Sequence, residues 1–420
     1  MPWRATFAPN AYLNISSDNE VTIIAHRAGA TARHMLVKAA GEKWGVEPAT
    51  CHTENGQVWH KETGKRVNFG DLVSVLQTME VPAEEVITLK PFSEYQLIGK
   101  EVPIYDVKDI TRGKAVFGAD VDLPDMLYAV IKRSPVVGGK IISYDDKKAK
   151  EVQGVKQVIK IDGFGTHPGL NKPLEGLAVI ADKTWAAMKG RDALEVVWDH
   201  GENKEYQCGT QMEAMIKSTE EDGKVRREKG DFKAALISAK KVFEKTYKAP
   251  YYAHSTIEPP TALAHYKSDG GMEIWAPTQH PQWARDSVAE ALDMDTAKVT
   301  VNVTLLGGGF GRKSKPDFVV EAALLSKATN TPIRVQWTRE DDIHHDYYHS
   351  HSAQRIKATL DGQGKLSGWN HHTVFPAIGG TSSAEDLHPS DGEMGLGCTD
   401  FPYEVPHIRI ESHESKAIPG

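Results

Sequence analysis

The 420-residue chain has little cysteine: Cys51, Cys208 and Cys398 are its only thiols, and they lie far apart. Three scattered cysteines make no disulfide framework, and they cannot supply the four thiolates that hold an iron–sulfur cluster. We expect them to be buried or incidental thiols, because free cysteines usually behave as small apolar side chains. Any iron–sulfur chemistry would therefore require a second chain.

The sequence also lacks long apolar runs and an excess of basic residues. No run approaches the roughly 18 apolar residues that indicate a membrane-spanning helix. Lys and Arg number 50 against 57 Asp and Glu, which gives a net charge of −7. A mildly acidic chain does not neutralise phosphates, so a general nucleic-acid binder is not expected. No apolar stretch follows Arg4, so no secretory signal is expected in the chain as given.

The N-terminal part predicts short strands and two helices. Strand-forming runs on either side of polar turns favour hairpins, and apolar residues at helical spacing favour helices. The expected elements are hairpins over residues 11–25 and 58–69, a helix containing Met35, Leu36, Ala39 and Ala40, and a short helix to Met79 capped by Asp71.

The remainder predicts a multi-domain α+β fold without internal repeats. Residues 99–182 have the texture of a compact α+β unit, in which residues 115–118 are expected as a strand and 145–152 as a helix. Beyond it, strands and helices alternate. Strands are expected over residues 194–198, 242–247, 271–275, 299–305, 333–337, 355–360 and 366–369, and helices over 211–218, 232–239, 283–292 and 317–328.

The strongest local signal is a glycine-rich loop at residues 307–311, between an alternating strand and an apolar helix. Its four glycines allow positive φ angles, and we expect such an angle at Gly309. They also allow a ligand to approach the backbone closely. Amides near a helix start also attract anions. The loop matches neither a dinucleotide fingerprint nor a P-loop. Counted from Gly307, Arg312 stands where the fingerprint has its last glycine. Arg312 also separates Gly311 from Lys313, which are adjacent in a P-loop. A ligand-free tight turn is the alternative.

Two proline-stiffened segments add weaker signals. Residues 275–281 place Gln279 on a turn between a strand and a helix, and residues 253–260 place His254 and Glu258 in another loop. Taken alone, Gln279 is a solvated turn amide and His254 with Glu258 is a hydrogen-bonded loop pair.

Together, the order and spacing of these three segments resemble the molybdopterin-binding catalytic subunit of the xanthine dehydrogenase and aldehyde oxidase family. The matching runs are 254–264, 275–281 and 307–313, and the branch typified by the isoquinoline 1-oxidoreductase β subunit is the most similar. The resemblance extends over nearly the whole chain.

The resemblance implies a domain order. Residues 1–98 would be an incomplete part of the second molybdopterin-binding domain, 99–185 an a/b hammerhead domain, and 186–420 the first molybdopterin-binding domain. The chain resembles an internally shortened and C-terminally truncated member, in which the region of the family's catalytic glutamate is absent. No catalytic residue is therefore assigned.

The resemblance also implies a function. The chain would be a subunit of a molybdenum hydroxylase, an oxidoreductase that oxidises aldehydes or N-heteroaromatic compounds with oxygen from water. The cofactor would be molybdenum–molybdopterin, expected as molybdopterin cytosine dinucleotide. A small [2Fe–2S] subunit would accept the electrons, with a cytochrome c as a candidate next acceptor. Relatives are often periplasmic, but this sequence indicates no compartment. The alternative is a non-catalytic remnant that folds without retaining the cofactor.

Site residues follow from the same resemblance. Gln279 would donate to an oxo ligand of the molybdenum, and Phe310 and Gly311 would lie against the metal's first coordination shell. Gly308 and Gly309 would allow that approach. Arg312 stands where xanthine dehydrogenases have glycine, and Ser314 where they have a purine-binding glutamate, which argues against xanthine as the substrate.

A His- and Asp-rich segment spans residues 341–351. Imidazoles and carboxylates together suit a divalent transition metal, but the spacing fits no helix-borne zinc motif. We expect an incidental or solvated cluster here, and the same for His371 and His372. A metal site using His345 and His349 is the alternative.

Overall fold

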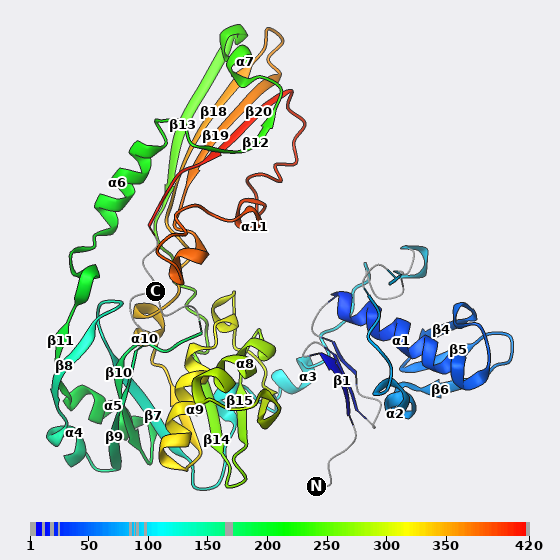
Figure 1. Cartoon of the computed structure of the whole chain (residues 1–420), viewed down its shortest axis with the longest axis vertical. Helices are drawn as coiled ribbons and strands as arrows, with labels where there is room; N and C mark the ends of the chain where they lie inside the picture. Colours follow the sequence, from blue (N-terminus) through cyan, green and yellow to red (C-terminus); the bar gives the residue numbers. More distant parts are fainter. Residues whose placement is uncertain are drawn as a thin grey trace. The chain divides into compact units, whose positions relative to one another are not determined.

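The computed structural model describes residues 6–10, 13–16, 21–23, 26–83, 86–87, 89, 92–95, 99–163 and 171–416. The chain forms two compact units, Met1–Gly113 and Lys114–Gly420. The described residues of these units form five separate sheets, whose strands are seen in Figure 1. In the described part of the chain, no helix combines the length and apolar character needed to cross a membrane.

In its described residues, the first unit contains two small antiparallel sheets. Its elements are β1 (Thr6–Asn10), β2 (Leu13–Ser16), β3 (Val21–Ile23), α1 (His26–Trp44), β4 (Cys51–Glu54), β5 (Gln57–His60), β6 (Arg66–Asn68), α2 (Val73–Leu76) and α3 (Val107–Ile110). Both expected hairpins are present as β2–β3 and β5–β6, although residues 11, 12, 17–20, 24 and 25 lie outside the described residues.

Helix α1 forms the core of this unit because one face of it is apolar. Met35 and Leu36 are buried together with Val58 and Leu72 from the segments that follow, as the helical spacing predicts. The expected cap by Asp71 is wrong. Helix α2 starts at Val73 without a side-chain cap, and the Asp71 carboxylate instead accepts a hydrogen bond from the Asn68 side chain.

The second unit is built around a seven-stranded mixed sheet. In spatial order its strands are β16 (Val299–Val303), β15 (Met272–Ala276), β14 (Thr261–Tyr266), β17 (Ile333–Gln336), β7 (Leu127–Arg133), β10 (Gly176–Ala181) and β9 (Val155–Ile161). The pairs β15–β16 and β17–β7 are parallel, and the other pairs are antiparallel. The sheet therefore combines strands that precede residue 185, the expected domain boundary, with strands that follow it in the sequence.

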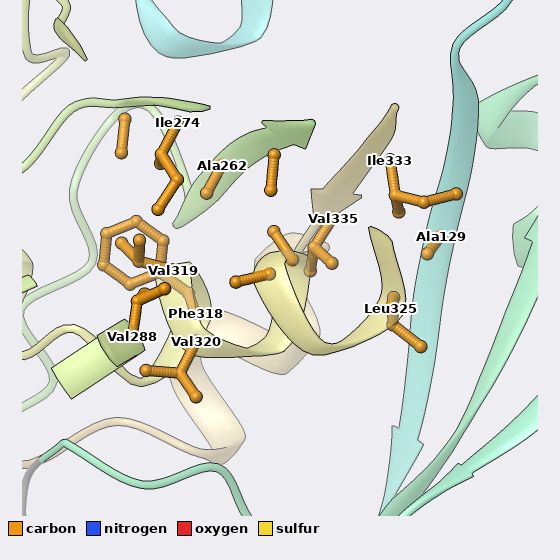
Figure 2. Close-up of a cluster of buried hydrophobic side chains, with 14 of the residues drawn as sticks. Ala129, Ala262, Ile274, Val288, Phe318, Val319, Val320, Leu325, Ile333 and Val335 are labelled. Atoms are coloured by element: carbon orange, nitrogen blue, oxygen red, sulfur yellow. The ribbon is translucent and has the colours of Figure 1, made fainter. Parts of the chain in front are cut away.

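Helix α9 (Asp317–Thr329) is the centre of the main core, next to α8 (Pro281–Leu292). It is buried on nearly every side, as expected of a helix that is apolar all round. Its side chains, among them Phe318, Val320 and Leu325, form one buried cluster with side chains of helix α8 and of strands β14, β15 and β17 (Figure 2). Both helices match their predicted positions closely, and the loop between β16 and α9 is thereby fixed at the edge of a rigid core.

A five-stranded sheet forms the rest of the unit together with short helices. Its strands, in order, are β12 (Lys224–Lys229), β20 (His407–Ser412), β19 (Leu366–Val374), β18 (Ser352–Leu360) and β13 (Lys241–Ala249). Strands β8 (Lys140–Asp145) and β11 (Glu195–Asp199) pair separately. The remaining helices are α4 (Lys147–Glu151), α5 (Thr184–Ala193), α6 (Cys208–Ser218), α7 (Phe232–Ser238), α10 (Arg339–His344) and α11 (Asp391–Met394).

Several strands have no clear signature in the sequence. Strand β12 is mostly charged, and β14 contains Ala and Leu rather than a β-branched pattern. Their conformation depends on pairing with neighbouring strands, which a single segment does not reveal. Residues 115–118 do not form the expected strand: Phe117 makes only an isolated bridge to Leu305 before a short 3-10 helix at Gly118–Asp120.

Candidate functional site

The glycine-rich loop after β16 has an unusual backbone. Gly308, Phe310 and Gly311 have φ values of 94°, 51° and 100°, in the left-handed region. A bulky residue such as Phe310 rarely adopts this conformation, and its side chain is 68% exposed. Gly309 lies outside this region, so the expected reason for a glycine there is wrong. The reason is space: a Cβ atom on Gly309 would lie 2.5 Å from Oε1 of Gln279.

The turn that carries Gln279 is bound to this loop by hydrogen bonds in both directions. The Gly311 amide donates to Oε1 of Gln279 at 2.9 Å, and the Gln279 amide donates to the Lys313 carbonyl at 2.9 Å. The Thr278 hydroxyl donates to the same carbonyl at 3.1 Å. The Nε2 group of the exposed Gln279 side chain is not used in these contacts, so it is the donor that the turn presents.

Glu258 holds the other side of the loop. Its carboxylate accepts from the Lys313 ammonium at 2.6 Å and from the Gly307 amide at 3.2 Å. Burial lowers the pKa of Lys313, and the neighbouring Glu258 opposes that change. The expected pair between His254 and Glu258 is wrong, because Nδ1 of His254 lies 2.9 Å from Oδ2 of Asp346. The structure thus brings all three predicted segments together through different contacts.

Arg312 is completely buried beneath the loop. Its guanidinium donates two parallel hydrogen bonds of 2.9 Å to Asp317, and its Nε lies 3.2 Å from Oδ1 of Asp346. Burial lowers the pKa of Arg312, but the charges of Asp317 and Asp346 raise it more, so the side chain stays charged. Its side chain therefore supports the loop from within the protein.

The indole ring of Trp337 packs against two arginines in this cluster. The Arg133 guanidinium is 3.9 Å and that of Arg312 is 5.0 Å from the centre of the indole ring. Arg133 and the indole nitrogen of Trp337 both donate to the buried carboxylate of Glu321. Burial raises the pKa of Glu321, and Arg133 opposes that shift. Through Arg312, these contacts join strand β7, helix α9 and the residue after strand β17 to the glycine-rich loop.

The buried acids Asp317, Glu321 and Asp346 were not predicted from the sequence. Asp317 and Glu321 lie four residues apart in a helix that is otherwise strongly apolar. A carboxylate in such a helix rarely stays buried without a partner, so this spacing was a usable sign of buried arginines nearby. Asp346 gave no comparable signal, because its partners lie on distant segments.

The His- and Asp-rich segment is only partly as expected. Among the residues that the structure describes, no three His, Cys, Asp or Glu side chains are grouped to hold a metal ion. The cluster is not simply solvated, however. Asp342 and Asp346 are fully buried because they pair with Arg339 and Arg312, whereas His344 and His349 are exposed.

The cysteines are all free thiols. Cys51 is buried, Cys398 is half-buried and Cys208 is exposed. Burial raises the pKa of the Cys398 thiol to about 11. The positions of Cys51 and Cys398 agree with the expectation of buried or incidental thiols.

Known proteins share the segment that carries this loop. Residues 216–417 match the model of a molybdopterin cofactor-binding domain. The chain is 28% identical to the beta chain of isoquinoline 1-oxidoreductase from Brevundimonas diminuta, over 79% of this chain and 46% of that protein. It is 30% identical to the membrane-bound aldehyde dehydrogenase [pyrroloquinoline-quinone] of Gluconacetobacter polyoxogenes, over 92% and 51%. It is 26% identical to a nicotinate dehydrogenase subunit of Pseudomonas putida, over 96% and 34%.

Solved structures show the same fold. Quinoline 2-oxidoreductase from Pseudomonas putida 86 superposes with a TM-score of 0.59 at 20% identity, covering 75% of this chain and 44% of that one. Aldehyde oxidoreductase from Desulfovibrio gigas gives 0.57 at 18% identity, covering 82% and 41%. The molecule therefore has the mixed α/β, multi-sheet fold of part of a molybdenum hydroxylase large subunit. The chain is homologous to the molybdopterin-binding large subunits of the xanthine dehydrogenase and aldehyde oxidoreductase family, as predicted. It spans about a third to a half of the length of these curated relatives.

The residues of the loop fit a bulky group that approaches the backbone. The main chain is open at Gly311, where a Cβ atom would have no neighbour nearer than 3.8 Å, whereas the absence of a side chain at Gly309 leaves room for Gln279 to pack against the loop. Gln279 adds a side-chain donor next to these amides. Backbone amides and a neutral donor of this kind suit the oxygen-rich, anionic character of a molybdopterin cofactor.

Proposed function

We propose that the chain supplies the molybdopterin-binding part of an oxidoreductase that hydroxylates aldehydes or N-heteroaromatic compounds with oxygen from water. The supporting observation is the loop at residues 307–313, whose open backbone is held by Glu258 and Gln279 inside the segment that matches the cofactor-binding domain. Relatives named for the oxidation of isoquinoline, aldehyde and nicotinate support the substrate class.

The residues proposed to contact the cofactor are Gln279, Gly308, Gly309, Phe310, Gly311 and Arg312. When bound, the molybdenum cofactor supplies the two-electron oxidation of the substrate. Gln279 donates through Nε2 to an oxygen ligand, while its Oε1 keeps Gly311 in position. The exposed Phe310 ring covers the bound group, and Arg312 supports the loop from beneath, because its guanidinium is occupied by Asp317 and Asp346.

The finer assignments belong to the same proposal. Residues 99–185 are the a/b hammerhead domain, residues 186–420 the first molybdopterin-binding domain, and residues 1–98 a part of the second. The cofactor is the cytosine dinucleotide form. A small [2Fe–2S] subunit takes the electrons and passes them to an acceptor such as cytochrome c. This view is supported by the chain's three isolated cysteines and by relatives that are named as subunits.

Metal and pterin analysis of the purified chain tests this proposal. The chain is produced in a host that makes molybdenum cofactor, with and without a candidate iron–sulfur subunit. We expect molybdenum to approach one atom per chain, and oxidation to release a fluorescent pterin. A folded chain with neither molybdenum nor pterin under both conditions would favour the alternative, a non-catalytic remnant, and would refute the proposal.

A further inference from the structure

A cavity of about 270 Å³ opens beside the glycine-rich loop. Its volume is near the lower end of small-molecule sites, roughly 300–1,000 Å³, which suits a compound with one ring. Aromatic rings form much of its wall. The ring centres of Tyr251 and Tyr348 lie 5.8 Å apart, and those of His254 and His349 lie 4.3 Å apart. The loop residues Phe310 and Gly311 line the cavity together with these rings and with Lys315.

Lys315 is the one Lys, Arg, Asp or Glu among these lining residues. The neighbouring cations differ from it, because Arg312 pairs with Asp317 and Asp346, and Lys313 pairs with Glu258. The Lys315 ammonium donates to the Ser314 hydroxyl at 3.1 Å. In the part of the chain that the structure describes, no carboxylate lies within ion-pair distance, 4.0 Å, of its Nζ.

The surroundings of Lys315 are unfavourable to an isolated positive charge. Burial lowers the pKa of its ammonium, and the charge of Arg312 lowers it further, while Asp317 and Asp346 act in the opposite direction from a longer distance. A negative group in the cavity would remove this disadvantage, because an opposite charge nearby stabilises the protonated form.

We infer that the cavity binds a single aromatic ring bearing a carboxylate, with the Lys315 ammonium donating to the carboxylate and the tyrosines packing against the ring. The inference rests on the proposed function, for which such a ring would be the substrate. Hydrogen bonds between ammonium and carboxylate are about twice as strong as those between neutral groups. A neutral ring of the same shape would leave the half-buried ammonium without a counter-charge, so it would bind less tightly.

Titration of the full-length chain with benzoate and with its neutral isostere benzamide tests the inference. Both are followed by calorimetry at pH 7, and inorganic phosphate is tested as a competitor. We expect benzoate to bind about tenfold more tightly than benzamide, a difference typical of one charge-assisted hydrogen bond. Lys315→Met should abolish this difference. Lys327→Met is the matched control, because Lys327 is also half-buried but donates to the Leu292 carbonyl.

Each other outcome overturns the inference. These outcomes are an absence of benzoate binding, equal affinity for the two ligands, an unchanged preference in Lys315→Met, and displacement of benzoate by phosphate, which would indicate a phosphate site instead. Melting temperatures of both variants show whether they are folded. The titration does not require molybdenum, so benzoate selectivity in a chain without pterin would refute the proposed function alone.

Discussion

The side chain of Gln279 and the backbone of Gly311 are joined by a hydrogen bond of 2.9 Å, in which the amide nitrogen donates and Oε1 accepts. The bond connects the turn after β15 to the loop after β16. Because Oε1 is used to hold the loop, Nε2 is the part of this side chain that can serve a ligand. One residue therefore combines a structural contact with a proposed binding contact, and substitutions can separate the two.

Replacing Gln279 should affect the cofactor more than the fold. In Gln279→Ala we expect the free energy of unfolding to fall by about 1 kcal/mol or less, the usual value of one hydrogen bond, and the molybdenum content to fall severalfold. Gln279→Glu keeps an oxygen for Gly311 but has no Nε2 donor. We expect it to retain stability and still lose cofactor. Metal analysis and urea unfolding of the same samples measure both effects, and full molybdenum content in Gln279→Glu would contradict the donor role.

Adding a single methyl group at Gly309 should disturb the site. The new Cβ atom would lie 2.5 Å from Oε1 and 2.6 Å from Cδ of Gln279, so Gly309→Ala has to displace that side chain from Gly311. We expect a large loss of bound molybdenum with a small change in melting temperature. Gly362→Ala is the control, because the nearest side-chain atom to its Cβ would be 3.9 Å away. Equal molybdenum content in both variants would show that close approach at Gly309 is not required.

Arg312 should be important for stability. Arg312→Met leaves Asp317 and Asp346 buried without their cation, and breaking a buried ion pair in this way typically costs about 3–5 kcal/mol. Urea unfolding at pH 7 measures the loss. Lys148→Met removes the exposed pair with Glu195 and should leave the unfolding free energy nearly unchanged, because solvent screens an exposed pair. The double variant Arg312→Met, Asp317→Asn should recover part of the loss; no recovery would show that the packing on Trp337 matters more than charge.

The five-stranded sheet should lose stability in mild acid through His371. Burial, assisted by the neighbouring His372, lowers the pKa of His371 from 6.5 to about 4. As the pH falls below 6.5 the unfolded chain takes up the proton first, so the stabilisation present above pH 6.5 is lost between pH 6.5 and 4. This group alone should make the protein about 2 kcal/mol less stable at pH 5 than at pH 8.

His371→Gln tests that assignment. The variant cannot take up the proton, so its unfolding free energy should change less between pH 8 and pH 5 than that of the original chain. Denaturant unfolding at the two pH values gives the difference. Other buried histidines, His372 and His413 among them, also have lowered pKa values and remain in both proteins. An identical pH dependence in the two proteins would exclude His371 as a source.

Much of the main core was predictable from the sequence, because helices α8 and α9 have apolar residues at clear helical spacing before and after recognisable turns. The meeting of the three loop segments was also expected from their order. Strand β12 was not, since its charged sequence becomes a strand only by pairing with β20. Local patterns determine elements, whereas pairing depends on the neighbours that folding provides.

The contacts beneath the loop were harder to predict. The partners of Arg312 are Asp317, five residues away, and Asp346, more than thirty residues away on the segment after α10. Ion pairs of this kind depend on the spatial arrangement of several elements, and the sequence alone does not give that arrangement. The role of Gly309 was misjudged for a similar reason, because the atom that restricts it belongs to Gln279 on another turn.

The loop after β16 is tied to its surroundings through Glu258, Gln279 and Lys313, and these ties involve only groups of the protein. A ligand arriving at such a loop has little chain left to order. The entropy lost in ordering the loop should accordingly be small, so less of the affinity gained from each new contact is offset by this ordering cost. Preorganisation of this kind favours long residence of a large prosthetic group over rapid exchange.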